Sequence, residues 1–152
     1  MKRFFSTAVL GLAAAALSVT PAMAAPPEPV PSEPFEIPGC EFAVQLDGSG
    51  SIKFTQHHGF STGIAPNLRA TLTNLETGES VSYVTTGVLH ETPTDTGVVI
   101  ERYTGHNLVW GPGIEGILFT TGTQTFVVDE AGTITLTESH GKVVNVCDVL
   151  AP

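Results

Sequence analysis

Residues 68–85 read LRATLTNLETGESVSYVT, and they carry the clearest structural signal in the chain. Apolar residues at positions 68, 70 and 72 alternate with polar ones, as expected of a strand that buries one face. Asn74, Thr77 and Gly78 then supply turn chemistry, and Val81 and Tyr83 resume the alternation. The segment therefore predicts a β-hairpin.

The same period of two recurs on both sides of this hairpin. Before it, Cys40, Phe42, Val44 and Leu46 fall on one face of a predicted strand. The turn-like segment 47–51 follows, and a strand at 52–58 is expected to complete a first hairpin with it. After residue 85, strands are predicted at 88–91, 98–104, 108–110, 117–121, 125–129, 133–138 and 143–149.

Glycine-rich segments divide these later strands. Turns are predicted at 93–97, 105–107, 111–113, 130–132 and 140–141. Closely spaced strands that are rich in Thr and Val are typical of an antiparallel β-sandwich or β-barrel, here of about 8–10 short strands. No window after residue 24 has the spacing of an amphipathic helix. The sequence therefore predicts an all-β domain.

The N-terminal segment has the three parts of a secretory signal peptide. Lys2 and Arg3 precede an apolar stretch at 8–17, and Ala22-Met23-Ala24 offers the small residues that a signal peptidase reads. We expect residues 1–24 to be removed before Ala25. The mature protein is then secreted to the extracellular space or cell envelope, without a transmembrane segment, because no later stretch is apolar for long enough.

Residues 25–38 carry six of the eleven prolines of the chain. A proline has no amide hydrogen to donate, so this segment is expected to be an extended linker rather than a helix or a central strand. The folded β domain is predicted to cover residues 39–152, with one hydrophobic core.

The mature domain is strongly acidic. Loss of Lys2 and Arg3 changes the formal net charge from −9 to −11, because all fifteen acidic residues lie beyond residue 24. Such a surface repels nucleic acid and anionic lipid. The partner classes that remain are an extracellular protein or a carbohydrate, and no cofactor is predicted.

Cys40 and Cys147 are the two cysteines of the chain, and both lie in the exported part. Disulfides form and persist in oxidising compartments, and two cysteines allow one intramolecular pairing. We therefore predict a Cys40–Cys147 disulfide, which would tie the first strand to the last.

Four segments together resemble a group of small exported actinobacterial all-β proteins. They are Gly39-Cys40, Thr104-Gly105-His106-Asn107-Leu108, Gly111-Pro112 and Val146-Cys147-Asp148-Val149-Leu150. The resemblance covers most of residues 39–150 and implies export, a β fold and the disulfide. The group has no assigned activity, so the resemblance implies no mechanism.

Short motifs of catalytic or metal sites lack their usual context. The segment 59–63 matches the G-x-S-x-G pattern of a serine hydrolase, but Pro66 blocks the helix that should follow. Asp95-Thr96-Gly97 matches an aspartic-protease triplet but is better explained as a turn. Of the five histidines, His57 and His58 are adjacent and point to opposite faces of a strand. No catalytic or metal-binding residue is therefore predicted.

Trp110 is the best candidate for a binding residue. It is the only tryptophan and lies beside Gly111-Pro112-Gly113, with Tyr103 and His106 a few residues before it. An aromatic side chain on such a loop can stack on a sugar ring or anchor a protein partner, although a tryptophan at this place more often closes the end of the core. We predict a secreted, non-enzymatic binding module or structural envelope component. The alternatives are a secreted protein inhibitor and, third, a small extracellular hydrolase.

Overall fold

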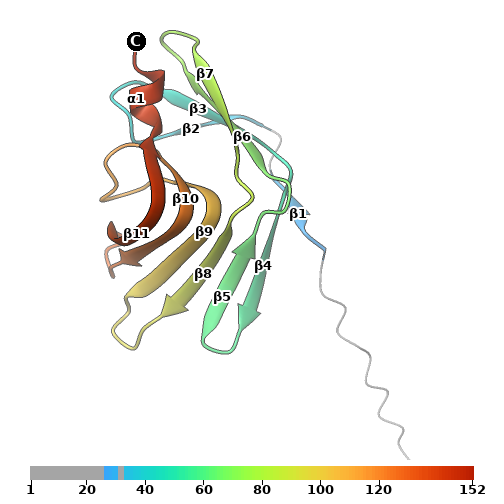
Figure 1. Cartoon of the computed structure of the whole chain (residues 1–152), viewed down its shortest axis with the longest axis vertical. Coiled ribbons are helices and arrows are strands. Elements are labelled where there is room, and N and C mark those ends of the chain that lie inside the picture. Colours follow the sequence, from blue (N-terminus) through green and yellow to red (C-terminus); the bar gives the residue numbers. More distant parts are fainter. Residues whose placement is uncertain (1–25, 31–32) are drawn as a thin grey trace, which may run out of the picture.

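The computed structural model describes residues 26–30 and 33–152, which form eleven strands and one short helix. The strands make two antiparallel sheets (Figure 1). The seven-stranded sheet contains, in spatial order, β1 (Glu28–Pro29), β4 (Ser51–His57), β5 (Phe60–Ile64), β8 (Val88–Pro93), β9 (Val99–Val109), β10 (Leu118–Val128) and β11 (Ile134–Asn145). The four-stranded sheet contains β2 (Phe35–Ile37), β3 (Val44–Ser49), β6 (Arg69–Asn74) and β7 (Ser80–Val84). The all-β, antiparallel prediction is confirmed, whereas the signal peptide and its cleavage site lie outside the described residues.

The predicted hairpin at 68–85 is the β6–β7 pair. Its register runs from Arg69 opposite Val84 to Thr73 opposite Ser80. The turn closes through a hydrogen bond of 2.8 Å from the Gly78 amide to the Asn74 carbonyl. Local alternation and turn chemistry were sufficient here because both strands lie in one hairpin.

The predicted first hairpin is wrong, because β3 and β4 belong to different sheets. β3 pairs with β2 and β6, whereas β4 pairs with β1 and β5. The chain passes from one sheet to the other through Gly50, which has a φ of +124°. A Cβ at Gly50 would lie 2.5 Å from the Asn67 carbonyl oxygen, so only glycine fits this crossing. The predicted turn at 47–51 is therefore extended chain.

Two predicted turns are also wrong, because β9, β10 and β11 are continuous strands of 11, 11 and 12 residues. Gly122 on β10 lies directly opposite Gly105 on β9 and Gly141 on β11, and all three have positive φ. Gly87, next to β8, adjoins Gly105. We call these four residues the glycine row. The row crosses the part of the sheet that curves in Figure 1, so its members bend the strands instead of ending them.

The curved sheet does not close on itself. β1 and β11 remain its two edges, and no ladder joins the two sheets among the residues that the structure describes. The β-barrel alternative is therefore wrong. The predicted strands are also too short, because each long strand had been divided at its glycine.

The expected linker contributes to the fold. β1 pairs with β4 and β2 pairs with β3, and Ile37 of β2 is only 5% exposed. The folded part thus begins before Gly39, the predicted boundary. Both strands are short and lie at sheet edges, where proline is tolerated because no neighbour needs its amide.

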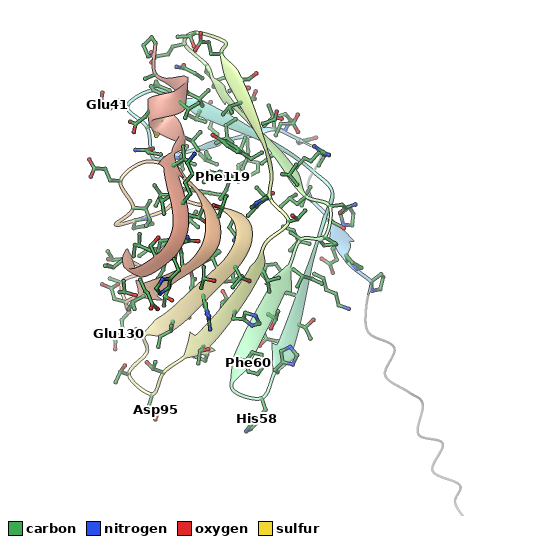
Figure 2. All side chains as sticks on the ribbon, in the orientation of Figure 1. Glu41, His58, Phe60, Asp95, Phe119 and Glu130 are labelled. Atoms are coloured by element: carbon green, nitrogen blue, oxygen red, sulfur yellow. A yellow bond between two sulfur atoms is a disulfide. The ribbon has the colours of Figure 1, made fainter. Side chains whose placement is uncertain are left out.

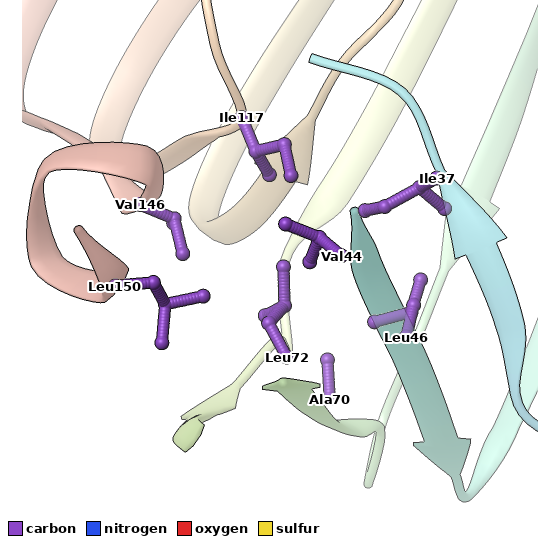
Figure 3. Packing of buried hydrophobic residues seen from close by; sticks show 8 residues of the cluster. All are labelled: Ile37, Val44, Leu46, Ala70, Leu72, Ile117, Val146 and Leu150. Carbon is purple, nitrogen blue, oxygen red and sulfur yellow. The ribbon is translucent and has the colours of Figure 1, made fainter. Parts of the chain in front are cut away.

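The main core lies between the four-stranded sheet, the start of β10 and the C-terminal helix (Figure 3). Its buried members are Ile37, Val44, Leu46, Ala70, Leu72, Ile117, Val146 and Leu150. The helix α1 (Val146–Leu150) is capped by Asn145, whose side chain accepts a hydrogen bond of 3.0 Å from the Cys147 amide. The predicted strand at 143–149 is therefore wrong beyond Asn145; a helix of five residues is too short to show a helical period in the sequence.

The predicted disulfide is confirmed. Cys40 and Cys147 are bonded, with their Cα atoms 5.3 Å apart. Cys40 lies in the loop between β2 and β3, and Cys147 lies in α1. The bond therefore fastens the C-terminal helix over the core, rather than joining the first strand to the last.

Asn74 ties the β6–β7 turn to the end of α1. Its fully buried side chain donates a hydrogen bond of 2.9 Å to the Leu150 carbonyl and accepts one of 2.8 Å from the Glu76 amide. Asn74→Ala should lower the free energy of unfolding by about 2–4 kcal/mol, since it leaves buried groups without partners. Asn67→Ala removes an exposed hydrogen bond to Ser51 and should cost less than about 1 kcal/mol. Urea unfolding measures both, and equal losses would contradict this role of Asn74.

Candidate binding site

An apolar cavity of about 330 Å³ is lined by both sheets, and we call it the inter-sheet cavity. The seven-stranded sheet and its connections contribute Ile52, Phe54, Gly63, Ala65, Gly87, Leu89, Asn107, Leu108 and Trp110. The four-stranded sheet and the segments beside it contribute Val30, Phe35, Leu46, Gly48, Leu68, Ala70 and Thr85. Leu46 and Ala70 also belong to the main core, so the cavity continues the core toward the surface.

The cavity exists because small residues stand where larger side chains would fill the space between the sheets. Gly63 lies opposite Phe54 in the β4–β5 ladder, and a Cβ on Gly63 would come within 2.8 Å of the Phe54 ring. Gly87 similarly leaves room for the amide of Asn107, which would lie 2.0 Å from a Cβ at that position. Ala65 and Ala70 widen the same space. The two glycines thus allow the Phe54 ring and the Asn107 amide to approach the backbone closely.

The wall offers few polar groups to a ligand. Thr85 donates its hydroxyl hydrogen to the Leu68 carbonyl at 3.4 Å, and Asn107 donates from Nδ2 to the Thr104 carbonyl at 3.1 Å. No charged side chain is among the described residues that line the cavity. A cavity of this composition holds water poorly and favours apolar molecules.

Two aromatic side chains mark the opening of the cavity. Phe54 is 63% exposed and Phe35 is 47% exposed, although both line the wall. Exposed apolar side chains indicate a binding site or an interface when they form a contiguous patch, and these two line the same cavity. Phe35 belongs to the N-terminal strand β2 and Phe54 to β4, so the opening lies between the edges of the two sheets.

The structure places one of the three predicted binding residues in the cavity. Trp110 lines the cavity and also packs against the main core. Tyr103 instead packs edge-on against Phe126, at 5.4 Å between ring centres. His106 is exposed and lies 5.9 Å from the ring of Phe119, a side chain labelled in Figure 2. The three residues do not form one site.

A second depression adjoins the cavity along the same face of the sheet. On β4, β5 and β8, each of the cavity residues Phe54, Gly63 and Leu89 has a residue of this depression two positions away along its strand. Those residues are Gln56, Ser61 and Glu91, for which we call it the polar depression; the rest of its lining is Gly59, Phe60, Pro93 and Val99. Because side chains two residues apart share a face, the apolar and polar surfaces are continuous.

The polar depression is acidic. The Ser61 hydroxyl donates a hydrogen bond to Glu91, which lies directly opposite Glu101 in the β8–β9 ladder. Burial raises the pKa of Glu101; the hydrogen bond of 3.0 Å from Tyr103 opposes this shift, and the charge of Glu91 adds to it. A negatively charged ligand would therefore be repelled from this end of the face.

The catalytic motifs fold as ordinary strand and turn. Ser61 lies within β5, not at a strand-to-helix turn, and Asp95 lies at the tip of the β8–β9 turn (Figure 2). Within residues 26–30 and 33–152, no cluster of three or more His, Cys, Asp or Glu side chains could hold a metal ion. No helix in this part of the chain is long and apolar enough to cross a membrane.

Most of the cavity wall was missed by sequence reasoning. Phe54 and Leu89 were placed on strands, but their shared space depends on β5 lying between β4 and β8. Gly48 and Gly63 were interpreted as turn chemistry and as part of a hydrolase motif. The signal that could have revealed the cavity was the presence of several glycines and alanines within apolar strands. A strand residue with little or no side chain leaves space beside the sheet.

Comparison of the chain with protein-family models, curated proteins and solved structures gives no match. The resemblance to small exported actinobacterial β proteins therefore stays a prediction. The candidate site rests on its own geometry, which is that of an apolar cavity beside an acidic depression.

Proposed function

We propose that the protein is an exported, non-enzymatic binding module that takes an uncharged apolar molecule, or the uncharged apolar part of a larger one, into the inter-sheet cavity. The observation that carries the proposal is the cavity of about 330 Å³ with Trp110 in its wall. Its volume lies within the range of about 300–1,000 Å³ that small-molecule sites occupy. The disulfide supports an extracellular setting, since such bonds persist in oxidising compartments.

Charge restricts the ligand further. The wall carries no charged group among its described residues, while Glu91 and Glu101 lie on the adjoining face of a domain with many more acids than bases. An anionic ligand would therefore lose hydration without gaining a partner. Binding would be driven by burial of apolar area, at about 25 cal/mol per Å².

A titration with 1-decanol tests this function directly. Trp110 is the only tryptophan, so its emission should change as the alcohol fills the cavity of the oxidised mature chain. A concentration of about ten times Kd should also raise the free energy of unfolding by about 1.4 kcal/mol. Decanoate differs from 1-decanol by its carboxylate and should bind at least about ten times more weakly. Its charge would enter a cavity whose wall offers no positive partner and which lies beside acidic residues.

Two matched variants locate the site. Ala65→Phe places a ring in the cavity and should abolish the response to 1-decanol. Thr55→Phe adds the same side chain at an exposed β4 position beside Phe54, on the opposite face, and should leave binding unchanged. Absence of any response in the natural sequence would contradict the proposed function. An unaltered titration in Ala65→Phe would place the ligand elsewhere.

A further inference from the structure

The sheet edges in the described part of the molecule are unequally protected. In the seven-stranded sheet they are β11 on one side and, on the other, β1 with the five residues of β4 that extend beyond it, 53–57. In the four-stranded sheet they are β2 and β7. Unpaired edges invite other strands, so proteins usually shorten them or supply prolines. β1 has two residues and ends at Pro29, and β2 has three residues between Pro34 and Pro38. β7 has five residues and lies against α1.

β11 is the exception. It is twelve residues long, it contains no proline, and nine of its residues are exposed. Figure 1 shows it as the outer strand of the curved part of the sheet. One whole side of this strand therefore has free backbone groups that a second strand could bind.

We propose that β11 is the interface of a homodimer, in which the β11 strands of two copies pair antiparallel about a two-fold axis at His140. In this register Glu138 of each copy lies opposite the partner's Lys142, and both residues lie on the stretch of β11 that pairs regularly with β10. Cross-strand pairs of opposite charge stabilise a sheet. Because the axis is a two-fold, each pair occurs twice.

The neighbouring symmetric registers lose these pairs. An axis at Gly141 would place Glu138 opposite the partner's Val144, and an axis at Ser139 would place it opposite the partner's His140. Of these three axes, only the one at His140 brings Glu138 opposite Lys142.

The charge distribution also favours this edge over the others. Two copies with a formal charge of −11 each repel one another in general. β11, however, carries one acidic and one basic residue, Glu138 and Lys142. Arg102 lies in the same row of the sheet, across Thr125 from Glu138, so half of the four basic residues of the mature chain gather here. Repulsion between copies is thus weakest where the backbone is free.

A single strand pair buries less than the roughly 1,200–2,000 Å² of a standard interface, so the dimer should be weak. Sedimentation velocity of the oxidised mature chain over a range of concentrations should show a reversible monomer–dimer equilibrium. Lys142→Glu sets like charges opposite each other twice, and should raise the dissociation constant about 10-fold. Glu138→Lys should do the same.

The charge-swapped double variant Glu138→Lys/Lys142→Glu should restore the dissociation constant, because both pairs are again of opposite sign. Lys53→Glu is the matched control, since it changes the net charge equally on β4, at the other end of the seven-stranded sheet from β11. A monomer at every concentration would overturn the proposal, and so would equal effects of Lys142→Glu and Lys53→Glu. Failure of the double variant to recover would rule out the register.

Cross-linking provides a measurement that does not depend on charge. His140→Cys should form a disulfide-linked dimer on oxidation, because residues on the axis lie opposite themselves at a distance that a disulfide can span. Thr135→Cys, on the same exposed strand, lies far from the axis and from its own copy in the partner, and should not cross-link above background. Equal yields from the two variants would overturn the proposed axis.

Discussion

Reduction of the Cys40–Cys147 disulfide should lower the melting temperature of the oxidised mature chain by more than about 10 °C. The bond closes a loop across 107 positions, and in the chain-entropy model a loop of that length contributes about 4–5 kcal/mol. Each kcal/mol corresponds to about 3–6 °C for a domain of this size. The structure adds a local reason, because the bond holds α1, which buries Val146 and Leu150 in the core.

Cys40→Ser and Cys147→Ser should each reproduce the effect of reduction. The double variant should be no less stable than either single one, because all three lack the same bond. Calorimetry with and without reductant measures the loss, and hydrogen exchange should show early opening of residues 146–150. A melting temperature unaffected by reductant would contradict the stabilising role of the bond.

Local patterns were enough to predict the β6–β7 hairpin, the antiparallel all-β class and the disulfide. The strands of the hairpin are adjacent across a short turn, and two cysteines allow only one intramolecular disulfide. The first predicted hairpin failed because Gly50 sends β4 to another sheet, and the composition of residues 47–51 suits a turn and a crossing equally well. Sheet membership depends on distant partners, which alternation does not specify.

The glycine row could have been predicted from the spacing of its glycines about the turns, which the alternation of apolar and polar residues does not reveal. Gly87 and Gly105 are equidistant from Thr96, and Gly122 and Gly141 are equidistant from the turn at Ala131-Gly132. Glycines placed symmetrically about successive turns come to lie opposite each other in an antiparallel ladder. That arrangement indicates a bend across the whole sheet, whereas a single glycine is typical of a turn.

The binding site was less accessible to such reasoning. Of the three predicted residues Trp110 lines the cavity, whereas Tyr103 packs against Phe126 and His106 lies near Phe119. The cavity also needs small residues from β3, β5, β6 and the segment before β8 to meet, and this depends on the order of strands in two sheets. Sequence periodicity identifies faces of strands but not the spaces between sheets.

Within the glycine row, Gly122→Ala should cause the largest loss in the free energy of unfolding among the strand substitutions proposed here. Gly122 has a φ of +91°, and a Cβ there would lie 2.3 Å from the His140 carbonyl oxygen of the neighbouring strand. That oxygen belongs to the backbone of β11, so relief requires the ladder to open. The left-handed backbone alone costs an alanine about 1–2 kcal/mol, and the displaced strand should bring the loss above about 4 kcal/mol.

Gly132→Ala separates the two causes. Gly132 has a similar φ of +81°, but a Cβ there would meet no atom of the described residues within 4 Å. This variant should lose about 1–2 kcal/mol, the backbone cost alone. Urea unfolding of both variants gives the difference, which measures the close approach of β10 and β11. Equal losses would mean that the strands can separate at the row without cost, and the bend would then not depend on glycine at these positions.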